Sequence, residues 1–188
     1  WDEMAGWAER MHTLAHAIGA MSHLGRAVHL AAAAAEGSGD LVNAIQRHER
    51  ALTIFRTVAY RRMEALTLQR LGASYLAQGD GHAALQWLVQ AQAIYPSLDL
   101  PVEASETAAY AALCQARLGQ PAVALAAVNR QLDVLAGELA ETPAAETILL
   151  RWLCQQVLQA VGDARAQAML EQLYADVQAR TAELTDAA

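Results

Sequence analysis

Apolar, alanine-rich stretches alternate with short polar steps along the chain, and this pattern predicts a series of helices. Most of the polar steps begin with glycine and recur every forty residues, with one last step after forty-three. They are Gly39-Asp40, Gly79-Asp80, Gly119-Gln120 and Gly162-Asp163. Asp at a helix start accepts hydrogen bonds from free backbone N–H groups, and the Gly before it permits a tight turn. A fixed period of this length indicates stacked helical hairpins.

The steps divide the chain into nine expected helices. Their ranges are 3–19, 22–37, 41–57, 61–78, 81–95, 102–118, 121–139, 144–161 and 164–183. Pro101, Pro121 and Pro143 suit helix starts, where the missing N–H of proline is harmless. Segments 96–101 and 139–143 are irregular connectors.

We expect one helical-repeat domain over residues 1–188, belonging to a larger protein. Its expected parts are a leading helix at 1–20 and four hairpins at 21–60, 61–100, 101–143 and 144–184. The leading helix is interpreted as the second half of a hairpin that begins upstream.

Composition favours the same fold class. About a quarter of the chain is alanine, the best helix former, while Phe occurs once and Pro four times. The predicted fold is all-α: a right-handed α-solenoid of antiparallel helix hairpins, with about nine helices.

The clearest repeat runs from Ala65 to Leu98. Counted from Ala65, residues of a characteristic size stand at fixed positions. They are Leu68, Leu71, Gly72, Tyr75, Ala84, Leu88, Ala91 and Pro96. Small residues let two helices approach, and large ones fill the space between hairpins. These positions resemble the signature of the tetratricopeptide repeat (TPR) superfamily. The neighbouring repeats match less well, because His48 and Arg56 stand where the signature has other residue types.

The forty-residue period is longer than the standard repeat. It resembles the helical arms of large bacterial signal-transduction ATPases and of maltose-activator-like transcription regulators. Two stretches carry this resemblance, Tyr60-Arg61-Arg62-Met63-Glu64-Ala65 and Ala160-Val161-Gly162-Asp163-Ala164-Arg165-Ala166. The chain has no Walker phosphate loop, so an NTPase module would lie outside it.

The net charge and the sequence context of the cysteines limit the partners and the cellular compartment that we expect. The net charge is −7 and every basic residue is arginine, so nucleic acid is not an expected direct partner. Cys114 and Cys154 lie in apolar helical stretches, which fits a reducing compartment, and we expect a cytoplasmic protein. No apolar run has the length of a membrane span.

Catalytic and cofactor signatures are weak. His12 and His16 stand one helical turn apart, but a metal site would need further ligands, and we expect partly exposed histidines instead. No serine or cysteine stands in a nucleophile context. We therefore expect no enzyme activity, no metal and no cofactor.

The resemblance to tetratricopeptide repeats implies a partner-binding groove. In that superfamily the first helix of each hairpin lines the concave face. When the groove positions of that superfamily are transferred to this chain, the groove residues are Arg26, His29, Gln69, Arg70, Glu106, Tyr110, Leu113, Arg117, Trp152 and Gln156. Arginine and aromatic residues dominate binding hot spots. The carboxylate clamp of some members is disfavoured, because it needs lysine and this chain has none.

We therefore expect a non-catalytic protein–protein interaction scaffold or regulatory arm of a multidomain bacterial signalling protein. The alternative is a small-ligand or peptide sensor domain of a transcription regulator or NTPase. A protein or peptide segment is the expected partner, without direct nucleic-acid or membrane contact. Trp1, Trp7 and Met11 suggest self-association through the N-terminal end, although packing within the first helix is the alternative use.

Overall fold

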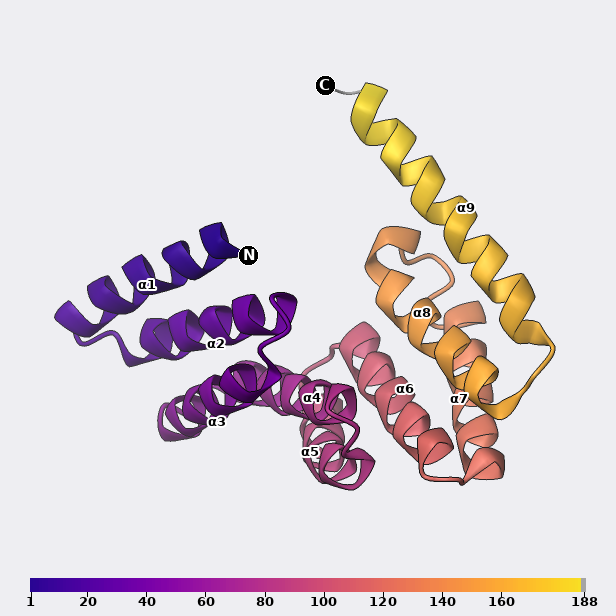
Figure 1. The fold of residues 1–188 in the computed structure, drawn as a ribbon, viewed down its shortest axis with the longest axis horizontal. Coiled ribbons are helices and arrows are strands. Elements are labelled where there is room, and N and C mark those ends of the chain that lie inside the picture. Colours follow the sequence, from indigo (N-terminus) through magenta and orange to yellow (C-terminus); the bar gives the residue numbers. More distant parts are fainter. Residues whose placement is uncertain (187–188) are drawn as a thin grey trace. The chain divides into compact units, whose positions relative to one another are not determined.

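The helices end close to where the polar steps predict, because each step is a helix-terminating turn. The computed structural model describes residues 1–186, and all regular structure in that range is helical (Figure 1), so the all-α prediction is confirmed. The helices are α1 (Asp2–Ala17), α2 (Met21–Gly37), α3 (Leu41–Thr57), α4 (Arg61–Ala77), α5 (Gly81–Ile94), η1 (Tyr95–Ser97, a 3-10 turn), α6 (Pro101–Arg117), α7 (Pro121–Ala136), α8 (Ala144–Val161) and α9 (Arg165–Asp186).

A left-handed backbone conformation recurs at the turns with half the period that the glycines suggested. Positive φ angles occur every twenty residues, at Gly19, Gly39, Ala59, Gly79, Asp99 and Gly119, and again at Gly162. Glycine adopts this conformation without a steric penalty, whereas an alanine does not. The forty-residue step is therefore the distance between every second turn.

Two aspartates after these turns cap the helices that follow. The Asp40 carboxylate accepts a hydrogen bond from the Asn43 backbone N–H at 3.1 Å, and Asp80 accepts one from Ala83 at 2.9 Å. Each bond satisfies one of the free N–H groups at a helix start. The capping role predicted for Gly-Asp steps is confirmed at both positions.

The chain divides into two compact units whose boundary lies inside the irregular connector 96–101. The first unit spans Trp1–Asp99 and contains α1 to α5 with η1, and the second begins at Leu100 and contains α6 to α9. Within each unit, successive helices pack as antiparallel hairpins (Figure 1).

Close approach of α2 and α3 forms one core of the first unit. Phe55 is fully buried, and a Cβ atom added at Gly25 would lie 2.7 Å from its ring. The surrounding apolar side chains are Ala15, Leu24, Val28, Ala51 and Ile54. Glycine at position 25 thus leaves the space that the ring fills.

The hairpin of α4 and α5 uses the same device. A Cβ atom added at Gly72 would lie 2.5 Å from Leu88 Cγ and 3.3 Å from the Ala84 carbonyl oxygen. Leu88 and Ala84 are fully buried. The close helix approach inferred from the repeat signature is therefore present here.

The second unit has its own core, in which α6 packs on both α7 and α8, and α8 packs on α9. Its fully buried side chains include Val128, Leu150, Leu153, Cys154 and Leu158. None of the helices described in either unit has the length and apolar character needed to cross a membrane.

Candidate functional site

The predicted groove residues of the first unit lie on α2 and α4, but their environments differ. Arg26 is exposed, whereas Arg70 keeps 42% of its side chain exposed and His29 is mostly covered. Gln69 is only 3% exposed, and its amide oxygen accepts a hydrogen bond from the Tyr95 hydroxyl at 2.8 Å. Gln69 thus links α4 to η1 in the interior rather than lying on an open surface.

A polar cluster joins His29 and Arg70 through residues that sequence reasoning missed. We call it the α2–α4 polar cluster, and its members are His29, Glu36, His48, Thr67, Arg70 and Ser74. Glu36 is its centre: one carboxylate oxygen accepts a bond from the Ser74 hydroxyl at 2.5 Å and lies 3.2 Å from His48 Nε2. The other oxygen lies 3.9 Å from the Arg70 guanidinium.

The two histidines of the cluster lie against each other. Their ring centroids are 4.9 Å apart, and His29 Nδ1 lies 3.1 Å from the Thr67 hydroxyl oxygen. His48 is fully buried, and its Nδ1 has no hydrogen-bond partner in the described structure. A buried polar atom without a partner destabilises the fold. The contact of His48 Nε2 with Glu36 is therefore the interaction that holds this ring in the interior.

Burial and charge fix the protonation states around Glu36. Burial, reinforced by the charges of His48 and Arg70, lowers the pKa of His29 to about 3, so this ring is neutral at neutral pH. Burial alone would raise the pKa of Glu36, but hydrogen bonds from His48 and Ser74 and the positive charges of His48 and Arg70 lower it. The cluster thus places a carboxylate within ion-pair distance of Arg70.

The sequence did contain a signal for this cluster. His48 stands where the repeat signature has a large apolar residue, so it is visible in the sequence as a mismatch. Its partner Glu36 lies twelve residues earlier, on the facing helix of the same hairpin. A polar mismatch in the core together with an acid on the facing helix predicts a buried pair.

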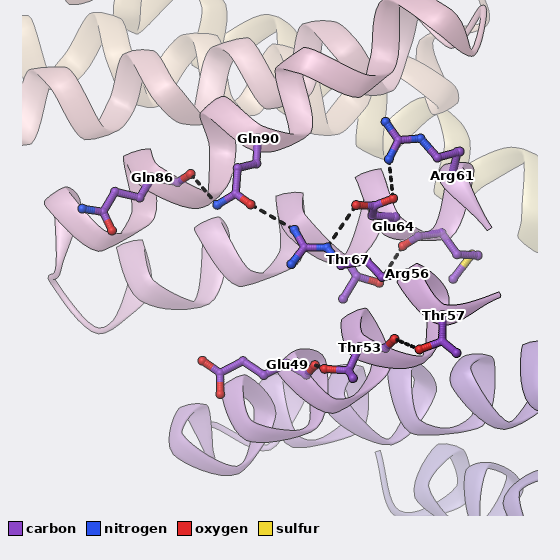
Figure 2. A network of polar contacts seen from close by, with 10 residues as sticks. Glu49, Thr53, Arg56, Thr57, Arg61, Glu64, Thr67, Gln86 and Gln90 are labelled. Carbon is purple, nitrogen blue, oxygen red and sulfur yellow. Dashed lines mark hydrogen bonds and ion pairs between the residues drawn. The ribbon is translucent and has the colours of Figure 1, made fainter. Parts of the chain in front are cut away.

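The second mismatch, Arg56, belongs to another polar network, which Figure 2 shows. Arg56 Nε donates to Glu64 at 3.1 Å and Nη2 donates to Gln90 at 3.0 Å, while Arg61 bonds the second Glu64 oxygen at 2.6 Å. Only 8% of the Glu64 side chain is exposed. This network connects α3 to α4 and α5, so Arg56 and Arg61 stabilise the packing of these helices.

A cleft in the first unit lies between α1 and α3, with α2 as its floor. It encloses about 330 Å³. Small residues of α2 line the base, and Arg47 and Arg50 of α3 stand opposite Glu9 and His12 of α1. The Arg47 Nε atom donates to Asn43 at 2.8 Å. This cleft was not predicted from the sequence.

In the second unit, the predicted groove residues lie on the neighbouring helices α6 and α8. Trp152 is 45% exposed, and Arg117 is exposed as well. Glu106, Tyr110 and Gln156 are partly covered, and Gln156 donates to the Gln155 amide oxygen at 2.7 Å.

Leu113 differs from this group, because it is only 3% exposed and belongs to the core of the second unit. The second unit also contains a cleft of about 530 Å³ between the start of α8 and the end of α9. Ile148, Val177 and Asp176 are among its lining residues.

The cysteine and histidine candidates considered for chemistry lie in different environments. Burial raises the pKa of Cys114 and of Cys154 to about 12, so both thiols stay protonated at neutral pH. The His12 and His16 rings stack with centroids 6.4 Å apart. Within the part of the chain that the structure describes, no group of three or more His, Cys, Asp or Glu residues could hold a metal ion.

Comparison with known proteins connects this geometry to a superfamily. A tetratricopeptide-repeat sequence profile matches residues 23–97. No curated protein matches the chain in sequence.

Solved structures show the same fold at low sequence identity. A single-substitution form of a putative kinesin light chain from Podosopora anserina, with nearly identical TPR-like repeats, has 18% identity and a TM-score of 0.62, covering 97% of this chain and 96% of its own. BtubC (BKLC) from P. vanneervenii has 12% identity and a TM-score of 0.59, covering 96% and 92%. The suspected resemblance to tetratricopeptide repeats is confirmed for residues 23–97, which match the repeat profile, and the chain as a whole has a TPR-like fold.

Proposed function

We propose that this chain is a non-catalytic protein-interaction scaffold that binds a partner segment on the first helices of its hairpins. The observation that carries the proposal is Arg70, whose guanidinium lies 3.9 Å from Glu36 while 42% of its side chain stays exposed in the tetratricopeptide-repeat region. A guanidinium presents paired donors that match the geometry of a carboxylate. The favoured partner is therefore an acidic protein or peptide segment.

Other residues support the same class of function. Arg26 lies exposed on α2 of the first unit, and Arg117 and Trp152 are exposed on α6 and α8 of the second. Arginine and tryptophan are the residue types that most often carry binding energy at interfaces. The protonated thiols Cys114 and Cys154 favour binding over nucleophilic chemistry.

We further propose that the chain serves as a regulatory arm of a multidomain bacterial signalling protein in the cytoplasm. The support is the forty-residue period and its resemblance to the arms of signal-transduction ATPases. The two free, buried cysteines fit a reducing compartment.

A second candidate is a sensor domain for a small ligand or peptide. The cleft of about 530 Å³ between α8 and α9 favours it, because its size and mainly apolar lining match ordinary ligand sites. In that case a ligand would raise the melting temperature, and Ile148→Glu, at the cleft wall, would abolish this shift.

The scaffold proposal is tested with binding peptides selected from a displayed library on the whole chain. Arg70→Ala combined with Arg117→Ala should weaken binding of the selected peptides at least tenfold, measured by calorimetry. A matched control, Arg50→Ala with Arg130→Ala, removes the same charge from exposed positions on α3 and α7. Unchanged affinity in the first variant would reject binding at the first helices of either unit, and loss in the control alone would assign binding to the second helices.

A further inference from the structure

One flank of α1 is apolar and largely exposed. Ala8 and Ala15 are buried on the flank that packs against α2. On the other flank Trp7 and Leu14 are 57% and 64% exposed, and Ile18, directly after the end of α1, is 69% exposed. With the partly covered Met11, they follow the alternating three- and four-residue spacing of a helix–helix seam.

We name these four residues, Trp7, Met11, Leu14 and Ile18, the α1 stripe. We propose that the α1 stripe is a self-association surface, on which two copies of this chain pair through antiparallel α1 helices. This inference does not depend on the scaffold function, because it concerns a different surface. A stripe that meets its own copy about a two-fold axis closes into a dimer and leaves no open end.

The exposed area is sufficient for such a dimer. The exposed fractions of the stripe, together with that of Met21 at the start of α2 (44%), correspond to roughly 500 Å² per copy when scaled to ordinary side-chain areas. A pair would bury at most roughly 1,000 Å², which is the lower size limit of a specific interface. An apolar patch of this size is comparable with the largest patch on a typical monomer, and such patches are often functional. We therefore expect a reversible dimer rather than a permanent one.

The charges of α1 select the antiparallel orientation. Asp2 and Glu3 lie in its first turn. An antiparallel pair keeps the acids of the two copies far apart and opposes the two helix dipoles, whereas a parallel pair would bring the acids together. The Arg10 guanidinium carbon lies 4.0 Å from the Trp7 ring centroid, so one face of this ring is covered within the chain and its remaining surface is available to a second copy.

The overall charge of the first unit permits the pairing. Residues 1–99 contain eight arginines and nine acidic residues, so two copies of this unit repel each other little. A two-fold axis between Met11 and Leu14 places Met11 of one copy beside Leu14 of the other. Trp7 then lies beside Ile18 of the second copy, so large side chains oppose each other along the stripe.

Sedimentation velocity on the whole chain, from about 1 to 500 µM, tests the proposal. The wild-type chain should shift from monomer to dimer over this range, and Leu14→Glu with Ile18→Glu should stay monomeric with unchanged helical circular dichroism. The matched control Val42→Glu with Val89→Glu changes two other exposed apolar residues of the first unit, 62% and 58% exposed, and should still dimerise. A wild-type chain that stays monomeric, or a control that loses the dimer, would overturn the proposal.

Cross-linking tests the orientation. A Met11→Cys variant should form a disulfide-linked dimer under mild oxidation, because residue 11 lies near the proposed axis. A Glu3→Cys variant should not, because the antiparallel pair separates the two positions by roughly 28 Å. The native cysteines, Cys114 and Cys154, are buried and free, so they should not form the intermolecular disulfide that the experiment detects. Efficient cross-linking through Glu3→Cys would reject the antiparallel arrangement.

Discussion

Ala59 adopts a backbone conformation that alanine disfavours, with φ at +54° in the turn between α3 and α4. Glycines fill four of the six turns that follow the twenty-residue step, and Asp99 fills another. An Asp tolerates this region better than Ala does, because its short polar side chain can bond locally. The turn at residue 59 is therefore strained relative to its equivalents.

Ala59→Gly should stabilise the first unit by about 0.5–1 kcal/mol, because relief of the left-handed strain exceeds the added entropy of the unfolded chain. Urea unfolding followed by circular dichroism measures the change. The control Ala77→Gly places the same substitution at the end of α4 and should destabilise by a similar amount. Equal effects of the two variants would contradict the strain argument.

His29 makes the stability of the first unit sensitive to acid. Its pKa falls from 6.5 to about 3 on folding, so below pH 6.5 the unfolded chain binds a proton that the native chain does not. The free energy of unfolding then decreases by up to about 1.4 kcal/mol per pH unit on acidification. Ionised Glu36, whose pKa is also lowered, adds a loss of the same sign near and below pH 4.5.

His29→Gln should therefore lose less stability than the wild type between pH 7 and pH 5. Urea unfolding at both pH values gives the comparison. His23→Gln removes an exposed histidine from the same helix and should keep the wild-type pH dependence. If both variants behave alike, the buried ring is not the source of the acid sensitivity.

At the scale of the helix pair, glycine determines how closely α4 and α5 approach. Gly72 faces the branched carbon of Leu88 at a distance that leaves no room for a Cβ atom. The Leu88 side chain cannot move away easily, because it is fully buried. This contact accounts for the small residue that the repeat signature has at this position.

Gly72→Ala should destabilise the chain by about 1–2 kcal/mol, since overpacking exceeds the helix-propensity gain of alanine. Gly6→Ala is the matched control, because that glycine is also helical but a methyl group added there would have nothing within 4 Å. It should stabilise α1 by about 0.5–1 kcal/mol. Thermal unfolding of both variants distinguishes packing from propensity, and two changes of the same sign would contradict the packing argument.

Helix ranges could be predicted from the sequence because glycine and aspartate mark most turns directly. The turns at Ala59 and Asp99 carry no glycine, so the twenty-residue step was visible only in the backbone angles. The α2–α4 polar cluster was missed for another reason: Glu36 and Ser74 are thirty-eight residues apart, and only the packing of two hairpins joins them. Counting groove positions likewise could not reveal that neighbouring segments cover Gln69 and Leu113.

At the scale of the whole molecule, two separate cores underlie the division at residue 99. Leu68 is fully buried in the first unit, and Leu150 is fully buried in the second. The sequence predicted a single repeat domain, since the helix pattern continues across the connector.

Leu68→Ala should destabilise the first unit by about 2–5 kcal/mol through the cavity that it leaves. Hydrogen exchange measured by mass spectrometry should then accelerate in α2 to α5 and stay unchanged in α6 to α9. Leu150→Ala should give the reverse pattern. Faster exchange throughout the chain in both variants would show that the two cores unfold as one.

Because the left-handed turns are equally spaced, the segment between two of them forms a repeat unit with equivalent ends. Gly39 and Gly79 close turns of the same backbone hand, each followed by an aspartate that caps the next helix. A segment that begins after one of these glycines and ends at the other therefore has matching ends. Gene duplication or deletion of such a segment would change the number of hairpins without creating a new kind of junction, so the length of the array can be altered in whole steps.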